Sequence, residues 1–186
     1  MIEHAQQKYQ VRFDWGSEGA SAIAQDADVV VWVDVLPPVG AEPLTGPDAV
    51  GASLPRTALV LAGGLNDASA VARRILDEQV RLGRRALVAV VAAGGTTPSG
   101  SIRFAVEDQL AAGAIVDALA GLGIDYSSPE AAAACAAFLG LRQAVAHLLT
   151  ASASAQEHVA AGRTPAELAP AGRLDTVSTV TVLQTP

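Results

Sequence analysis

Residues 28–36 read DVVVWVDVL, and this stretch decides the fold class. It is a nearly continuous apolar run, which is typical of a strand that is covered on both faces. The runs TALVLA at 57–62 and ALVAVVA at 86–92 have the same character. Residues 177–183 (VSTVTVL) are rich in β-branched side chains and predict an edge or half-exposed strand, and residues 10–13 are a shorter candidate.

Segments with a helical spacing of apolar residues alternate with these strands. The sequence predicts helices over residues 17–25, 67–82, 103–122, 129–150 and 154–161. Ser128 and Pro129 are the expected N-cap and first residue of one helix, and Gly83 is the expected stop of another. Alternating strands and helices predict one α/β domain over residues 1–186, a three-layer α/β/α sandwich around a mostly parallel or mixed sheet.

Composition and charge exclude several classes of protein. The apolar share of 51% is ample for a core, and the single cysteine, Cys135, excludes an internal disulfide. With 12 Lys and Arg against 19 Asp and Glu, the chain lacks the positive surface that nucleic-acid binding needs. Uncharged apolar stretches stay below the ~18 residues of a membrane span, and the polar N-terminus is unlike a signal peptide. We therefore expect a cytoplasmic protein with no membrane segment.

Asp34 is the strongest single candidate for a binding or catalytic residue, because it lies at the expected carboxyl end of a strand. Ligands bind at the carboxyl ends of the strands in parallel sheets. Burial of a carboxylate is costly unless it is paired or binds a metal ion such as Mg²⁺. The residues alone leave open whether Asp34 binds a metal ion or caps a neighbouring backbone group.

Two glycine pairs follow the next strands. Gly63 and Gly64 precede a helix, where free N–H groups can bind an anion such as phosphate, although a plain strand–turn–helix connection has the same pattern. Gly94 and Gly95, followed by Thr96, open a loop rich in hydroxyl groups.

Glu107 and Asp108 come next along the chain. They are adjacent in a predicted helix, so their side chains point about 100° apart, and at most one is expected to face a site. Ordinary surface charge is the other interpretation of this pair.

Four motifs together resemble the 2-phosphosulfolactate phosphatase (ComB-like) family. They are VRFDWG at 11–16, VVVWVDVL at 29–36, GGLNDASAVA at 63–72 and VEDQLAAGAIVDAL at 106–119. The resemblance implies a hydrolase with an α/β/α fold that depends on Mg²⁺ and cleaves the phosphate ester of a small hydroxy acid. It makes Asp34, Glu107 and Asp108 the candidate catalytic and metal-binding residues. The candidate phosphate-binding backbone is that of Gly63, Gly64, Gly94, Gly95 and Thr96.

The sequence also departs from this family. PPVG at 37–40 replaces a polar segment, and SASAQE at 152–157 replaces a stretch that holds an arginine. The remaining cationic candidates are Arg12, Arg56, Arg103 and Arg142. The alternative is therefore a catalytically degenerate homologue that acts as a ligand-binding or interaction protein.

The expected partner is a small phosphorylated or anionic molecule. A homodimer is possible through the alanine-rich helices at 110–122 and 131–149, although packing within one chain explains these small residues equally well.

Overall fold

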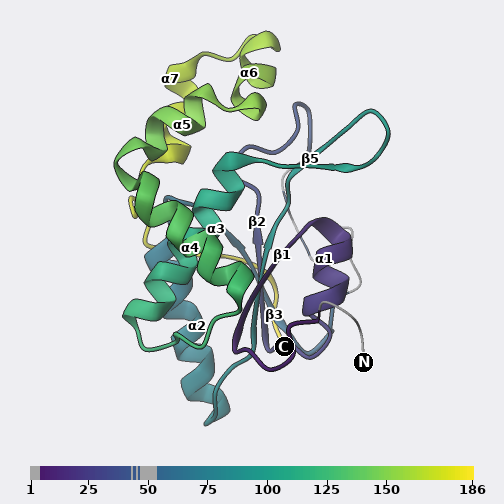
Figure 1. Ribbon diagram of the computed structural model, residues 1–186, viewed down its shortest axis with the longest axis vertical. Coiled ribbons are helices and arrows are strands. Elements are labelled where there is room, and N and C mark those ends of the chain that lie inside the picture. The colour runs from purple at the N-terminus through teal and green to yellow at the C-terminus, as the bar shows by residue number, and fades with distance from the viewer. Residues whose placement is uncertain (1–4, 43, 45, 47–53) are drawn as a thin grey trace.

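The protein is built around one five-stranded sheet (Figure 1), and the computed structural model describes residues 5–42, 44, 46 and 54–186. The strands are β1 (Val11–Trp15), β2 (Val29–Val33), β3 (Leu59–Gly63), β4 (Val88–Ala92) and β7 (Thr181–Gln184). Their order across the sheet is β1–β4–β2–β3–β7, and only β7 runs antiparallel to its neighbour. The predicted α/β class with a mostly parallel, mixed sheet is confirmed.

The helices divide unequally between the two faces of the sheet. They are α1 (Gly16–Ile23), α2 (Ala68–Leu82), α3 (Val106–Gly121), α4 (Pro129–Leu141), α5 (Val145–Ala151), α6 (Ala153–Ala160) and α7 (Pro165–Leu168). Helix α1 lies on one face, where Val30 and Trp32 point, and α2, α3 and α4 cover the other face (Figure 1). Side chains of β2 alternate between these faces because a strand has a period of two residues.

The structure corrects several predicted boundaries. The helix expected at 103–122 begins at Val106, because residues 102–103 form β6 (Ile102–Arg103), which pairs with β5 (Gly95–Thr96) in a hairpin. The helix expected at 129–150 is interrupted by a 3₁₀ turn, Arg142–Ala144, after which Val145 and Leu149 turn into the core. Ser128 accepts the expected capping bond from the Ala131 N–H at 3.1 Å. The predicted loop at 37–55 falls partly outside the described residues.

Helices α3 and α4 pack in unusually close contact at Gly113. A Cβ atom on Gly113 would lie only 2.2 Å from the carbonyl oxygen of Ala134, so this position admits no side chain. Ala131 and Ala134 are buried in the same interface. Much of the alanine in α3 and α4 thus serves packing within the chain, and the homodimer stays a prediction.

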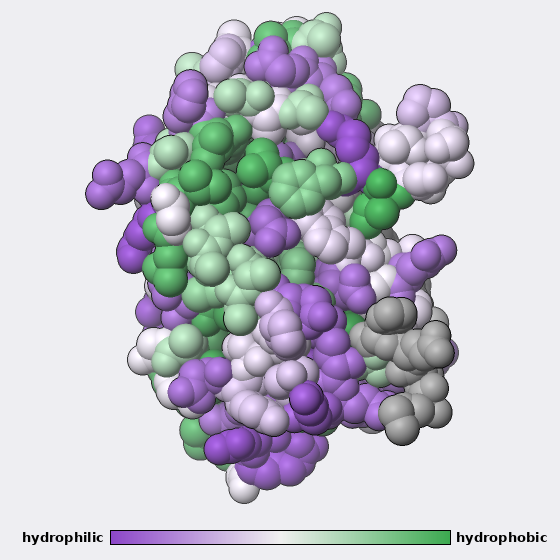
Figure 2. Space-filling view, in the orientation of Figure 1, coloured by the Kyte–Doolittle hydropathy of each residue, from purple (hydrophilic) through white to green (hydrophobic). Residues whose placement is uncertain are grey.

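The outer surface of the helical layer carries exposed apolar side chains. Apolar side chains gather where α4 meets α5 (Figure 2), and Leu139 and Leu141 are exposed there. By length and composition alone the helical run Pro129–Ala160 would be able to cross a membrane, and 22% of its most apolar window is buried inside the fold. The 3₁₀ turn and the N-cap at Ser152 divide this run into separate helices. The expectation of no membrane span stays a prediction.

Candidate functional site

Asp34 follows β2 directly and lies at the carboxyl edge of the sheet. It comes two residues after Trp32 and therefore points to the same face, the face that carries α1. Its side chain is largely buried, and burial together with the nearby charge of Glu107 raises the pKa of Asp34 to about 6. Its carboxylate accepts no hydrogen bond from any residue that the structure describes. The ionised form of the Asp34 side chain is therefore destabilised at this position.

Asp108 connects two of the strand ends. It lies in the first turn of α3, and its two carboxylate oxygens accept hydrogen bonds from the N–H groups of Val35 (2.8 Å) and Gly94 (2.9 Å). Burial raises the pKa of Asp108 well above its usual range, and the neighbouring carboxylates add to this rise. Because both oxygens are already engaged, Asp108 positions the loops that follow β2 and β4.

Glu107 is also buried, with an exposed fraction of 1%. Its Oε2 atom has no hydrogen-bond partner among the residues that the structure describes. An unpartnered buried carboxylate oxygen is rare in native proteins, because no hydrogen bond replaces those that it loses with water. Both acidic residues of this pair are therefore buried, and the interpretation of the pair as ordinary surface charge is wrong.

Asp34 and Glu107 fit a divalent cation as a pair. Mg²⁺ is commonly held by one or two carboxylates, with water and substrate phosphate completing its coordination. A cation near both side chains would satisfy Glu107 Oε2 and stabilise the ionised form of Asp34. Within the described part of the chain, no group of three acidic, histidine or cysteine side chains is arranged to enclose a metal ion.

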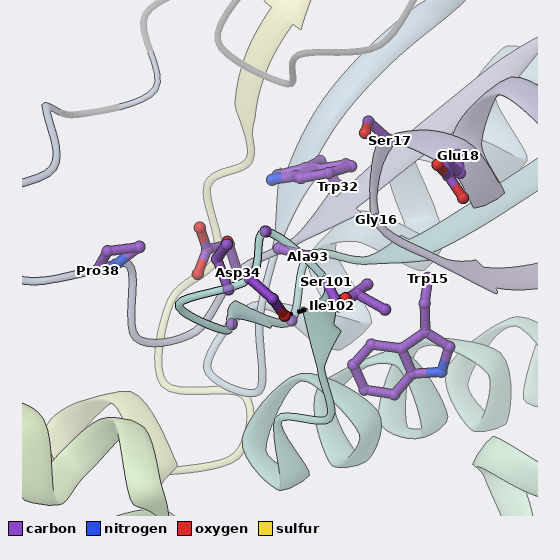
Figure 3. Close-up of a pocket in the computed structure, with 15 residues that line it drawn as sticks. Trp15, Gly16, Ser17, Glu18, Trp32, Asp34, Pro38, Ala93, Ser101 and Ile102 are labelled. Carbon is purple, nitrogen blue, oxygen red and sulfur yellow. Dashed lines mark hydrogen bonds between the residues drawn. The ribbon is translucent and has the colours of Figure 1, made fainter.

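A cleft of about 620 Å³, the main cleft, opens beside Asp34 (Figure 3). Gly94, Gly95 and Thr96 line it, as do the residues that lead into α1 and the β5–β6 hairpin. Asp34 also borders a second cavity of about 220 Å³, which Gly63 and Gly64 line. The three predicted strand ends therefore meet at Asp34, but their glycines are distributed between two cavities.

Two of the predicted phosphate-binding N–H groups are already engaged. The N–H of Gly64 donates to Asp67 at 2.7 Å, and that of Gly94 donates to Asp108. Neither is free to bind a phosphoryl oxygen in this arrangement.

Arg103 is the cationic candidate that the structure brings to the glycine loop. Its guanidinium group lies so close to Gly95 that a Cβ atom there would be 2.8 Å from Nη2. Arg103 also pairs with Glu157 of α6 at 3.1 Å, beside a small cavity that His158 helps to line. By contrast, Arg12 is buried in an ion pair with Asp26. Arg56 and Arg142 line none of these three cavities.

No protein-family model and no curated protein matches this sequence. The resemblance to 2-phosphosulfolactate phosphatases thus stays a prediction, and the site is interpreted from its own geometry.

Sequence reasoning missed one whole side of the main cleft. Trp32 and the first turn of α1, namely Gly16, Ser17 and Glu18, line it together with the glycine loop. The signal for Trp32 was present in the pattern, because a residue two positions before Asp34 in a strand shares its face. The hairpin had no such signal, since its strands are only two residues long.

Proposed function

We propose that this chain is a divalent-cation-dependent hydrolase of small phosphate monoesters, with Mg²⁺ as the cation. The observation that carries the proposal is a pair of interacting carboxylates, Asp34, which lines the main cleft, and the buried Glu107, whose charge acts on it. One member has a strongly raised pKa and the other has an unpartnered buried oxygen. Two like charges that interact in this way are unfavourable unless a cation offsets them.

Asp34 and Glu107 would hold the cation, which when bound would offset the charge of the phosphoryl group and make a coordinated water more acidic. The fit rests on the unpartnered Glu107 oxygen and on the absence of competing hydrogen bonds to Asp34 among the described residues. Asp108 contributes by fixing the loops on which Asp34 and Gly94 lie.

Hydrolysis exchanges one P–O bond for another. Oxygen from water bonds to phosphorus, the bond from phosphorus to the alcohol oxygen breaks, and the alcohol leaves with a proton. Asp34 would hold the cation in its ionised form, and the proton of the attacking water passes to bulk solvent through the main cleft. The guanidinium group of Arg103 supplies positive charge beside Gly95.

The alternative is a protein that binds an anionic ligand without turning it over. One observation favours it, since Arg103 is already paired with Glu157 and is therefore partly neutralised. The two proposals share a binding site and differ in whether phosphate is released.

The test is an assay of phosphate release from 2-phosphosulfolactate and a panel of other phosphate monoesters, with and without Mg²⁺. We expect release that requires Mg²⁺ and is lost in Asp34→Asn and Glu107→Gln. Asp77→Asn is the matched control, because Asp77 is an exposed residue of α2, remote in sequence from the site. Binding of a phosphate ester without release from any substrate would select the alternative. Release that survives both site variants would show that the reaction occurs elsewhere.

A further inference from the structure

The main cleft contains a polar group that the proposed reaction does not use, the indole N–H of Trp32. This side chain is 7% exposed and borders the cleft. In Figure 3 the nitrogen end of the ring faces the side of the cleft where Asp34 and Pro38 lie. The N–H donates to no acceptor among the residues that the structure describes. The nitrogen is not among the fully buried atoms, so it is open to the cleft and available to a ligand that binds there.

The first turn of α1 presents further donors to the same cleft. The helix begins at Gly16, and its N-cap residue, Trp15, makes no side-chain capping bond. The first N–H groups of a helix have no acceptor within the helix, and the helix dipole favours an anion at this end. Gly16, Ser17 and Glu18 all line the cleft. Trp32 and this turn therefore border the same cleft from two separate elements, with the indole nitrogen on the side of Asp34.

Packing fixes the position of this turn. Gly16 has φ +62°, in the left-handed region, and a Cβ atom there would lie 2.7 Å from Cδ1 of Ile102. Strand β1 thus passes into α1 without a loop, and the β5–β6 hairpin packs over the junction. Donors that are held in place in this way lose little entropy when they bind a ligand.

The donors on this side of the cleft are neutral. Among the described residues that line the main cleft there is no lysine, arginine or histidine, and Asp34 and Glu18 are acidic. An anion must therefore be bound by N–H groups, with a cation at Asp34 offsetting the negative charge. Oriented N–H groups at a helix N-terminus commonly bind phosphate in this manner.

We propose that the Trp32 indole N–H and the first-turn N–H groups of α1 form the phosphoryl-binding subsite of the main cleft. The inference rests on the proposed function only for the identity of the bound group, a phosphate monoester or inorganic phosphate. It assigns phosphate binding to the α1 side of the cleft and supplies donors that Gly64 and Gly94 cannot, since theirs are engaged.

The chain has two tryptophans, which makes a direct test possible. Two indole N–H signals are expected in a ¹⁵N-resolved proton spectrum, and Trp15→Phe assigns them. The ring of Trp15 is tilted against that of Phe104, with centroids 5.2 Å apart; it packs against the core of the opposite face and also borders the main cleft. Titration with inorganic phosphate in the presence of Mg²⁺ should shift the Trp32 signal downfield. If neither signal moves while calorimetry detects phosphate binding, the proposal is overturned.

Two variants measure the contribution of each element by calorimetry with inorganic phosphate. Trp32→Phe keeps an aromatic ring and removes the donor, so we expect Kd to rise about tenfold, as for a lost hydrogen bond to a charged group. Glu18→Gln removes negative charge and keeps every N–H, so Kd should fall about twofold. An unchanged Kd in both folded variants would place the phosphate away from this wall.

The outcomes also separate this inference from the proposed function. Phosphate binding at Trp32 without hydrolysis of any ester would overturn the hydrolase and leave the subsite standing. Hydrolysis with an unmoved Trp32 signal would overturn the subsite and leave the hydrolase. Absence of both binding and hydrolysis would overturn both.

Discussion

Replacing Asp34 by asparagine should stabilise the protein while abolishing the proposed activity. Burial, with the charge of Glu107, raises the pKa of Asp34 from 3.8 to about 6. Each unit of pKa corresponds to ~1.4 kcal/mol, so ionised Asp34 lowers the free energy of unfolding by about 3 kcal/mol at neutral pH. A raised carboxyl pKa means that the folded state binds the proton more tightly than the unfolded state. The penalty is therefore small below pH 4 and complete above pH 6.

The assay is thermal unfolding of the wild type and Asp34→Asn at pH 4 and pH 7.5, without divalent cations. At pH 7.5 the Tm of the variant should be higher by up to about 10 °C, since ~1 kcal/mol shifts Tm by 2–4 °C in a chain of this size. At pH 4 the difference should nearly vanish, because Asp34 of the folded wild type is then protonated. Asp77→Asn changes the net charge equally and should show no such pH dependence. A stability difference that is the same at both pH values would refute the reasoning.

Three further predictions follow from single contacts. Gly113→Ala should lower the free energy of unfolding by about 3 kcal/mol or more in urea, because helices α3 and α4 must separate to admit the methyl group. Asp108→Asn replaces one acceptor oxygen by an amide donor, so it should lower the free energy of unfolding by about 1–3 kcal/mol. The backbone amide of Val35 or Gly94 should then exchange faster with solvent. Unchanged exchange at both residues would show that Asp108 does not hold the loops. Mg²⁺ must displace the proton of Asp34, whose pKa without a cation is about 6, so the Kd for Mg²⁺ should rise as the pH falls below 6; an equal Kd at pH 5 and pH 7.5 would remove Asp34 as a ligand.

Apolar runs predicted the centre of the fold well. Strands β2 and β4 consist entirely of buried residues, so their sequences carry a continuous signal. The position of Asp34 at the carboxyl edge follows from the same pattern, because the run ends there. The β5–β6 hairpin could not be predicted, since each strand has two residues and no periodicity. Its place over α1 depends on Ile102 meeting Gly16, which are far apart in the chain.

The different roles of the two adjacent acidic residues, Glu107 and Asp108, could not be predicted from the sequence either. Glu107 and Asp108 are adjacent and chemically alike, yet only Asp108 meets two backbone N–H groups. One of those groups is Val35, 73 residues away in sequence. The role of each carboxylate therefore depends on loops that follow other strands, and the local spacing of residues in the sequence does not predict it.

Three polar groups without partners in the described chain are concentrated at this edge of the sheet: the Asp34 carboxylate, Glu107 Oε2 and the Trp32 indole N–H. Two acceptors and one donor point to a ligand of mixed character, a cation for the carboxylates and an anion for the N–H. A cation–phosphate pair has both properties, whereas a cation alone would leave the Trp32 N–H to water and an anion alone would add repulsion to Asp34. Mg²⁺ and phosphate should therefore bind cooperatively, each lowering the Kd of the other by the same factor, and calorimetric titrations of each alone and in the presence of the other would measure that factor.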